Sequence, residues 1–158
     1  MATYEITYRR RLVKDGPAPA SVDTPLIAAD YFRDNCFEAS EMWREKVYAL
    51  FVDRRKRPLG HFLVGVGSDT SVTMGCKLVA KAALDCFASG VILCHNHPSG
   101  DPRPGQDDIR ETGALKRGLD SLDIQLIDHI ILGEKAFFSF TEETEHPYGK
   151  PSKRQRHG

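Results

Sequence analysis

The chain has 158 residues and 41% of them are hydrophobic, which is typical of one folded domain that buries about two-thirds of its unfolded surface. Its 22 lysines and arginines balance its 22 aspartates and glutamates, so net charge excludes a general electrostatic attraction to nucleic acid or membranes. No apolar run reaches the length of a membrane span, so we expect no membrane partner. The four cysteines contain no CxxC pair, so we expect free thiols in a cytoplasmic protein.

The first half of the chain is predicted to form strands around one helix. Residues Thr3–Val13 alternate weakly and contain three arginines, which favours an edge strand. Thr24 is a typical helix N-cap with proline after it, so a helix is expected over Pro25–Asn35. The apolar run Val47–Val52 predicts a strand buried on both faces, and Leu59–Val66 predicts its partner after a charged turn.

The second half is predicted to alternate helices with strands. A helix over Gly75–Ala88 precedes a core strand, Val91–Cys94, and a helix over Gln106–Ser121 precedes the strands Ile124–Leu132 and Ala136–Phe140. Helical spacing predicts buried faces made of Leu78, Val79, Ala82, Ala83 and Cys86 in the first helix and Ile109, Leu115, Leu119 and Leu122 in the second. This alternation predicts an α/β or α+β fold, a layered sheet with helices on its faces.

A run of polar residues, His95 to Gly100, follows the strand Val91–Cys94, at the end of a sheet strand where ligand sites are common. If the strand continues through His97, alternation places both imidazoles on one face, roughly 6–7 Å apart. Asp108 lies eleven residues after His97 and can be brought back by the intervening Gly/Pro-rich loop. The sequence therefore offers two imidazoles and one carboxylate for one metal ion.

These ligand types suit zinc, and three protein ligands leave a fourth position open to water, as in catalytic sites. Zinc lowers the pKa of a bound water to about 7, which supplies hydroxide at neutral pH. The alternative for His95 and His97 is a pair of loop histidines without a metal. Asp107 could replace Asp108 as the ligand, or could cap the helix instead. Ser99 is expected to form a turn after Pro98.

A hydrolytic site also needs a general base within hydrogen-bond reach of the attacking water. Glu45 is the candidate because it lies just before the buried strand Val47–Val52. The alternative is an ordinary exposed carboxylate beside two basic residues. His129 is interpreted as structural, and His61 and His146 are expected at the surface.

The segment HNHPSGDPRPGQDD (His95–Asp108) resembles the RadC-like branch of the JAB/MPN (JAMM) metalloprotease superfamily. The superfamily pattern is an upstream Glu, then HxH, seven residues, Ser, two residues and Asp. EKVYALFVD (Glu45–Asp53) and LDIQLIDHIILGEKAFFSF (Leu122–Phe140) resemble the family as well. The resemblance implies a RadC-like JAB/MPN domain over residues 1–145, with a mixed sheet flanked by helices similar to cytidine deaminases. The polar and basic composition of residues 146–158 predicts a flexible tail.

The resemblance also implies roles for the site residues. His95, His97 and Asp108 would hold Zn²⁺, and Glu45 would act as general base on the zinc-bound water. The best-understood relatives hydrolyse isopeptide bonds to ubiquitin-like proteins. A zinc-dependent metallopeptidase or isopeptidase is therefore expected, acting on a protein or peptide substrate such as a ubiquitin-like conjugate.

One position departs from the family pattern, because the family serine falls on Gly105. That serine helps to stabilise the oxyanion of the tetrahedral intermediate. Losing one such donor costs roughly 100- to 1000-fold in rate when the site depends on it. The metal site is expected to be retained with reduced peptidase efficiency, and the backbone N–H of Gly105 could partly substitute for the lost hydroxyl.

The alternative function is a non-catalytic or weakly active RadC-like protein associated with DNA repair or DNA binding. Basic residues gather at Arg9–Arg11, Arg54–Arg57 and Lys150–Arg156, where DNA could be contacted. An HNH nuclease is excluded because the residues of that motif are dispersed over a ββα unit. A zinc deaminase is excluded because the chain lacks H-x-E with P-C-x-x-C.

Overall fold

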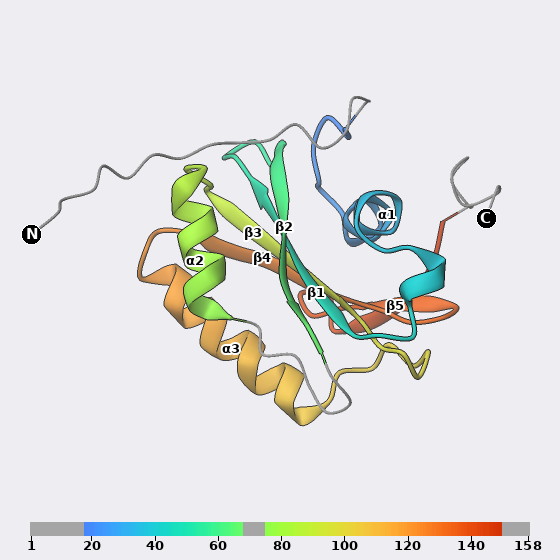
Figure 1. Cartoon of the computed structure of the whole chain (residues 1–158). Helices are drawn as coiled ribbons and strands as arrows, with labels where there is room; N and C mark the ends of the chain where they lie inside the picture. Colours follow the sequence, from blue (N-terminus) through green and yellow to red (C-terminus); the bar gives the residue numbers. More distant parts are fainter. Residues whose placement is uncertain (1–17, 68–74, 150–158) are drawn as a thin grey trace, which may run out of the picture.

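The computed structural model describes residues 18–67 and 75–149 (Figure 1). Its helices are α1 (Pro25–Asn35), the short 3-10 helix η1 (Ala39–Glu41), α2 (Cys76–Asp85) and α3 (Gln106–Asp120). Its strands are β1 (Lys46–Val52), β2 (Pro58–Val66), β3 (Gly90–Asn96), β4 (Gln125–Leu132), β5 (Ala136–Ser139) and β6 (Thr144–Pro147). The strand expected over Thr3–Val13 lies outside the described residues. Within the described ranges, no helix combines the length and the apolar character needed to cross a membrane.

The strands of the described part form one mixed sheet in the order β2-β1-β3-β4-β5-β6. β3 and β4 run parallel, and the other neighbouring pairs are antiparallel. Helix α1 covers one face of the sheet, and α2 and α3 cover the other (Figure 1). This architecture confirms the predicted mixed sheet flanked by helices.

Strand β3 lies inside the sheet and contributes side chains to both cores. Val91 and Leu93 pack in the core under α2 and α3, whereas Ile92 and Cys94 pack in the core under α1. All residues of β3 are buried, as expected for a strand covered on both faces. Continued alternation places the side chain of His95 on the α2 and α3 face of the sheet.

Helix α1 begins as the sequence predicts. The Thr24 hydroxyl oxygen accepts a hydrogen bond from the Ile27 N–H at 3.2 Å, and Pro25 occupies the first helical position. A proline is favoured there because its missing N–H would have no partner inside the helix. The helix buries one apolar stripe, made of Ala28, Phe32 and the following Cys36.

The predicted buried faces of α2 and α3 are only partly correct. Leu78 is 47% exposed, Ile109 is 48% exposed and Leu122 is 42% exposed. Leu78 lies about 100° around the helix from Val79, which is fully buried with Ala83. Ile109 lies about 120° around α3 from Leu115 and about 80° from Leu119, so the prediction assigned it to the wrong side of the helix. Leu122 keeps the spacing of Leu115 but follows the helix end, where spacing no longer predicts burial.

A flexible tail was expected over residues 146–158, but an ordered strand covers Thr144–Pro147. These residues form β6, which pairs with β5 at the edge of the sheet. Tyr148 also packs against the α1 core, and its hydroxyl donates to the Gly133 carbonyl at 2.7 Å. The predicted tail of residues 146–158 therefore starts too early. Residues 150–158 lie outside the described ranges.

Glycine at position 133 permits a close approach that shapes the loop after β3. A Cβ on Gly133 would stand 2.5 Å from the Gly100 carbonyl oxygen and 2.8 Å from the Pro102 ring. The Gly100 carbonyl also accepts a hydrogen bond from the Glu134 N–H at 2.9 Å. The loop is thereby held against the β4–β5 turn, which directs the chain from His97 towards α3.

Candidate metal centre

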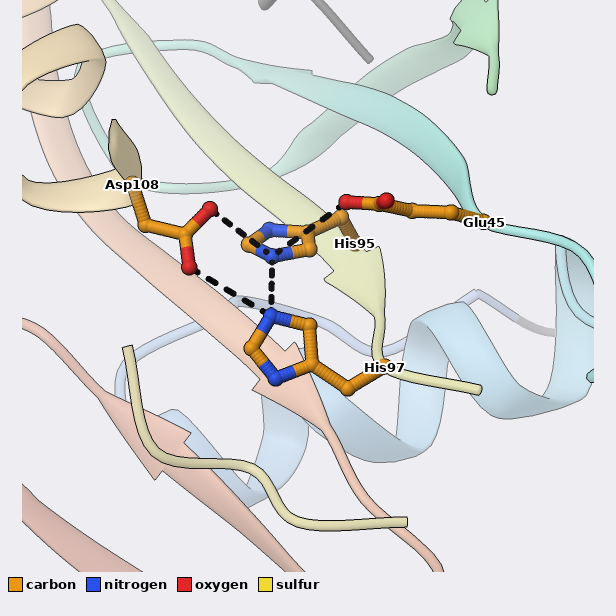
Figure 2. A group of neighbouring side chains, drawn as sticks. All are labelled: Glu45, His95, His97 and Asp108. Carbon is orange, nitrogen blue, oxygen red and sulfur yellow. Dashed lines mark hydrogen bonds and ion pairs between the residues drawn. The ribbon is translucent and has the colours of Figure 1, made fainter. Parts of the chain in front are cut away.

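Three separate segments bring the predicted site residues together. His95 lies near the end of β3 and His97 follows the strand directly. Glu45 immediately precedes β1, whose Val47 pairs with His95, and Asp108 lies in the first turn of α3. Figure 2 shows the four side chains pointing toward one another. One potential ligand atom from each residue lies within 4.8 Å of all the others.

The distances between the three predicted ligands fit a tetrahedral zinc site. His95 Nε2 lies 3.4 Å from Asp108 Oδ1, and His97 Nε2 lies 3.4 Å from Asp108 Oδ2. The two Nε2 atoms are 2.9 Å apart and would separate slightly to bind one ion. Zinc–ligand distances of about 2.0–2.1 Å place tetrahedral ligands about 3.3–3.4 Å apart. The donor set and its spacing therefore fit the metal that the sequence implies, although these three residues as zinc ligands remain a prediction.

The orientation of His97 is set by its second ring nitrogen. Nδ1 lies 2.7 Å from the backbone carbonyl oxygen of Asp101. A carbonyl can only accept, so Nδ1 carries a proton, and in the neutral ring Nε2 is the nitrogen whose lone pair is available to a metal ion. Such an outer hydrogen bond is the usual way in which proteins orient a metal-binding imidazole.

Burial and charge give the three residues different proton affinities. Burial lowers the pKa of His95 to about 4, so its ring is neutral at pH 7 and able to bind a metal. Burial acts in the same direction on His97, but the Asp108 carboxylate and the Asp101 carbonyl outweigh it and raise its pKa. Burial opposes the charge of Asp108, yet His97, His95 and the Gly105 N–H together lower its pKa to about 2.

The structure favours Asp108 over Asp107 as the ligand. Asp107 forms an exposed ion pair with Arg110 at 2.7 Å, away from the histidines. Asp108 occupies the third position of α3, and its Oδ2 accepts a hydrogen bond from the Gly105 N–H at 2.8 Å. Because that N–H is already committed to Asp108, the suggestion that it could replace the family serine is wrong.

Glu45 lies beside the two histidines and remains accessible. Its Oε1 is 3.9 Å from His95 Nε2, and its side chain is 27% exposed, compared with 0% for His95. Burial raises the pKa of Glu45, and the Asp108 carboxylate adds to this while His97 opposes it. A carboxylate with a raised pKa is suited to accept a proton and later release it. Its catalytic role remains a prediction.

Asn96, which the sequence interpretation left without a role, positions the segment that carries Glu45. Its Oδ1 accepts from the Lys46 N–H at 2.8 Å, and its Nδ2 donates to the carbonyls of Met42 and Arg44 at 3.1 and 3.0 Å. The residue is fully buried. The signal in the sequence was a polar side chain at the end of an otherwise apolar strand, which suggests a buried hydrogen-bonding role. The partners of Asn96 could not be predicted, because they are set by tertiary contacts.

Of the other described histidines, two contact residues outside the ligand cluster and the third contacts His95. His61 contacts the Tyr31 hydroxyl at 2.8 Å, and His146 contacts Glu142 at 2.7 Å. Both are half-buried and lie outside the ligand cluster, as expected. His129 is fully buried, and its Nε2 lies 2.7 Å from His95 Nδ1. It is a direct neighbour of a predicted ligand, which the sequence interpretation missed.

A cavity of about 770 Å³ opens beside His97. Its walls come from α1 and η1, the loop after β3, the β4–β5 turn and Tyr148. Apolar surface is supplied by Phe37, Met42 and Leu132, and acidic residues such as Glu38 stand among the lining. Ser99 also lines the cavity and accepts a hydrogen bond from the Asp101 N–H, as expected for a turn residue.

The basic turn between β1 and β2 lies at the opposite end of the sheet from these residues. Val47 of β1 pairs with His95, whereas Val52, which precedes the turn, pairs with Gly90 at the start of β3. Within the turn, Asp53 pairs with Arg57 at 2.7 Å. DNA binding through this turn remains a prediction, and the other two basic segments lie outside the described residues.

Comparison with known proteins gives one consistent result. A profile of the RadC-like JAB domain family matches residues 22–146. The chain is 35% identical over 130 residues to a UPF0758 protein of Aquifex aeolicus, covering 82% of this chain and 54% of that protein. Similar proteins occur in Coprothermobacter proteolyticus, at 34% identity over 85% of this chain and 58% of the relative, and Thermotoga maritima, at 36% over 80% and 55%. The chain thus spans little more than half the length of these relatives.

Proposed function

The chain belongs to the family of RadC-like JAB domains, and on this premise we propose that it is a zinc-dependent hydrolase that cleaves amide or isopeptide bonds in protein or peptide substrates. The observation that supports this most strongly is the convergence of His95, His97 and Asp108, with Glu45 beside them. Three protein ligands and a neighbouring carboxylate are the components of a hydrolytic zinc site rather than of a closed structural one.

The position of each side chain indicates its role in the proposed reaction. His95, His97 and Asp108 would hold the ion, which when bound polarises the scissile carbonyl and lowers the pKa of water. Glu45 would accept the proton of the attacking water at a carboxylate oxygen and return it to the departing amine nitrogen. Its partial exposure leaves room for water and substrate, and its raised pKa suits both proton transfers.

The cavity beside His97 is the proposed place for part of the substrate. Its mixture of apolar walls and a few polar groups is typical of ligand sites, and it adjoins a predicted metal ligand. A peptide lying across His97 could place a side chain in this cavity and its scissile carbonyl near Glu45.

Metal removal tests the proposed function. The full chain, loaded with zinc, is incubated with ubiquitin-like conjugates and with a peptide library, and cleavage is followed by mass spectrometry. We expect cleavage by the zinc-loaded chain, loss of cleavage after chelation, and recovery when zinc is restored. Cleavage that survives complete removal of metal, or no cleavage of any member by protein with one bound zinc, would contradict this function.

A further inference from the structure

A line of buried side chains runs from the predicted metal ligand His95 to helix α3. His95 Nδ1 lies 2.7 Å from His129 Nε2, and His129 Nδ1 lies 2.7 Å from the Thr112 hydroxyl oxygen. The hydroxyl in turn donates to the Asp108 backbone carbonyl at 2.5 Å. Both imidazoles are fully buried and Thr112 is 9% exposed. Three elements, β3, β4 and α3, are joined by this line.

The proton positions along the line follow from the chemistry of its last member. The Asp108 carbonyl can only accept, so the single hydroxyl proton of Thr112 is directed to it. Thr112 must then accept from His129, which places the proton of that ring on Nδ1. His129 Nε2 is therefore an acceptor, and His95 donates to it from Nδ1. The lone pair of His95 Nε2 is left facing His97 and Asp108.

The reverse arrangement leaves the line with one proton too few. If His129 carried its proton on Nε2, its Nδ1 would need the Thr112 hydroxyl proton, and the Thr112 and Asp108 oxygens would face each other at 2.5 Å with no proton between them. His95 Nδ1 would then accept, so its own proton would lie on Nε2, directed at the other predicted ligands. A protonated Nε2 cannot bind a metal ion.

We propose that Thr112 and His129 are positioning residues that hold His95 in the tautomer whose Nε2 can bind a metal. The ring of Phe140 stacks on His129 with centroids 4.6 Å apart and an angle of 11°, which fixes the plane of that imidazole. The backbone of Asp108 thereby orients His95, while its carboxylate lies beside the same ring. This inference depends on the metal binding of the proposed function and not on its hydrolytic step.

Thr112→Val is the variant that separates the hydroxyl from the shape of the side chain. Valine keeps the branched form of threonine but removes the acceptor for His129 Nδ1–H. We expect zinc affinity to fall roughly 10- to 100-fold, the range typical of lost outer partners of metal-binding histidines. Thr112→Ser, which retains a hydroxyl, is expected to bind zinc within a few-fold of the wild type.

A matched control removes a buried hydroxyl that does not contact this line. Ser139 is fully buried and donates to Asp128 Oδ2 at 2.7 Å, on the other side of β4 from His129. Ser139→Ala is therefore expected to lower thermal stability without changing zinc affinity. Equal losses of zinc affinity in Ser139→Ala and Thr112→Val would overturn the positioning role, because general loosening would explain both.

Two readouts on the full chain complete the test. Zinc affinity is measured by competition with a chelator, and long-range ¹H–¹⁵N NMR of metal-free protein above pH 7 shows which nitrogen of His95 carries the proton. We expect Nδ1–H in the wild type and Thr112→Ser, and a population with Nε2–H in Thr112→Val. A wild type protonated at Nε2, or Thr112→Val with wild-type tautomer and affinity, would overturn the inference. A wild type with the Nδ1–H tautomer that cleaves nothing supports it and counts against the hydrolytic function alone.

Discussion

Replacing Glu45 with glutamine is expected to lower the rate of hydrolysis by roughly 10²- to 10⁴-fold while the protein still binds one zinc ion. Glutamine has the shape of glutamate but cannot accept the proton of the attacking water. The three predicted ligands are unchanged, so metal content should not fall. Steady-state kinetics on any substrate found with the wild type, together with metal analysis, measure both quantities.

The pH dependence of Glu45→Gln offers a second check. In the wild type the rate should decline on acidification as Glu45 becomes protonated, at a pH above the ordinary glutamate pKa of 4.5 because burial raises the pKa of this group. The variant should lack that decline. Asp107→Asn is the matched control, since Asp107 is exposed and paired with Arg110. Equal rate losses in the two variants, or an unchanged rate in Glu45→Gln, would contradict a base at position 45.

Restoring a serine at position 105 is expected to raise the rate of hydrolysis, by up to roughly 100-fold if its hydroxyl stabilises the oxyanion. The site can accept the change. A Cβ on Gly105 would meet only Asp108 Oδ2, at 3.6 Å, and the backbone there has φ −80°. The substituted hydroxyl would lie at the N-terminus of α3, next to a predicted ligand. Comparison of kcat for Gly105→Ser and the wild type tests this.

A second effect of Gly105→Ser must be separated from the first. Gly105 is the N-cap of α3, and a serine there would improve helix capping by a few tenths of a kcal/mol. Thermal unfolding measures that effect independently of turnover. Gly105→Ala adds the Cβ without the hydroxyl, so it should leave the rate low. A rate increase in Gly105→Ala that equals that of Gly105→Ser would exclude the hydroxyl as its cause.

Much of the fold could be predicted because local patterns are strong in this chain. The N-cap Thr24 and the apolar run Val47–Val52 indicate their elements without reference to the rest of the molecule. Strand β6 could not be predicted in this way, because the segment Thr144–Pro147 is polar and is held by its pairing with β5. Leu122 keeps the spacing of Leu115 but follows the end of α3, so spacing alone did not reveal its exposure.

The candidate site could likewise be predicted only in part from the sequence. Strand alternation predicts that His95 and His97 share a face, and the structure brings Asp108 and Glu45 to them from α3 and β1. Asn96 and His129 support the site through hydrogen bonds to residues that are distant in sequence, so these contacts could not be predicted. The commitment of the Gly105 N–H to Asp108 likewise required the geometry of the helix start.

The position of the metal is the most direct test of the proposed zinc site. Crystals of the zinc-loaded full chain, measured at the zinc absorption edge, give an anomalous difference map that locates the ion without assumptions about activity. We expect one strong peak, about 2.0–2.2 Å from His95 Nε2, His97 Nε2 and an oxygen of Asp108. The absence of a peak among these three side chains, or a peak bound by other residues, would contradict the proposed zinc site.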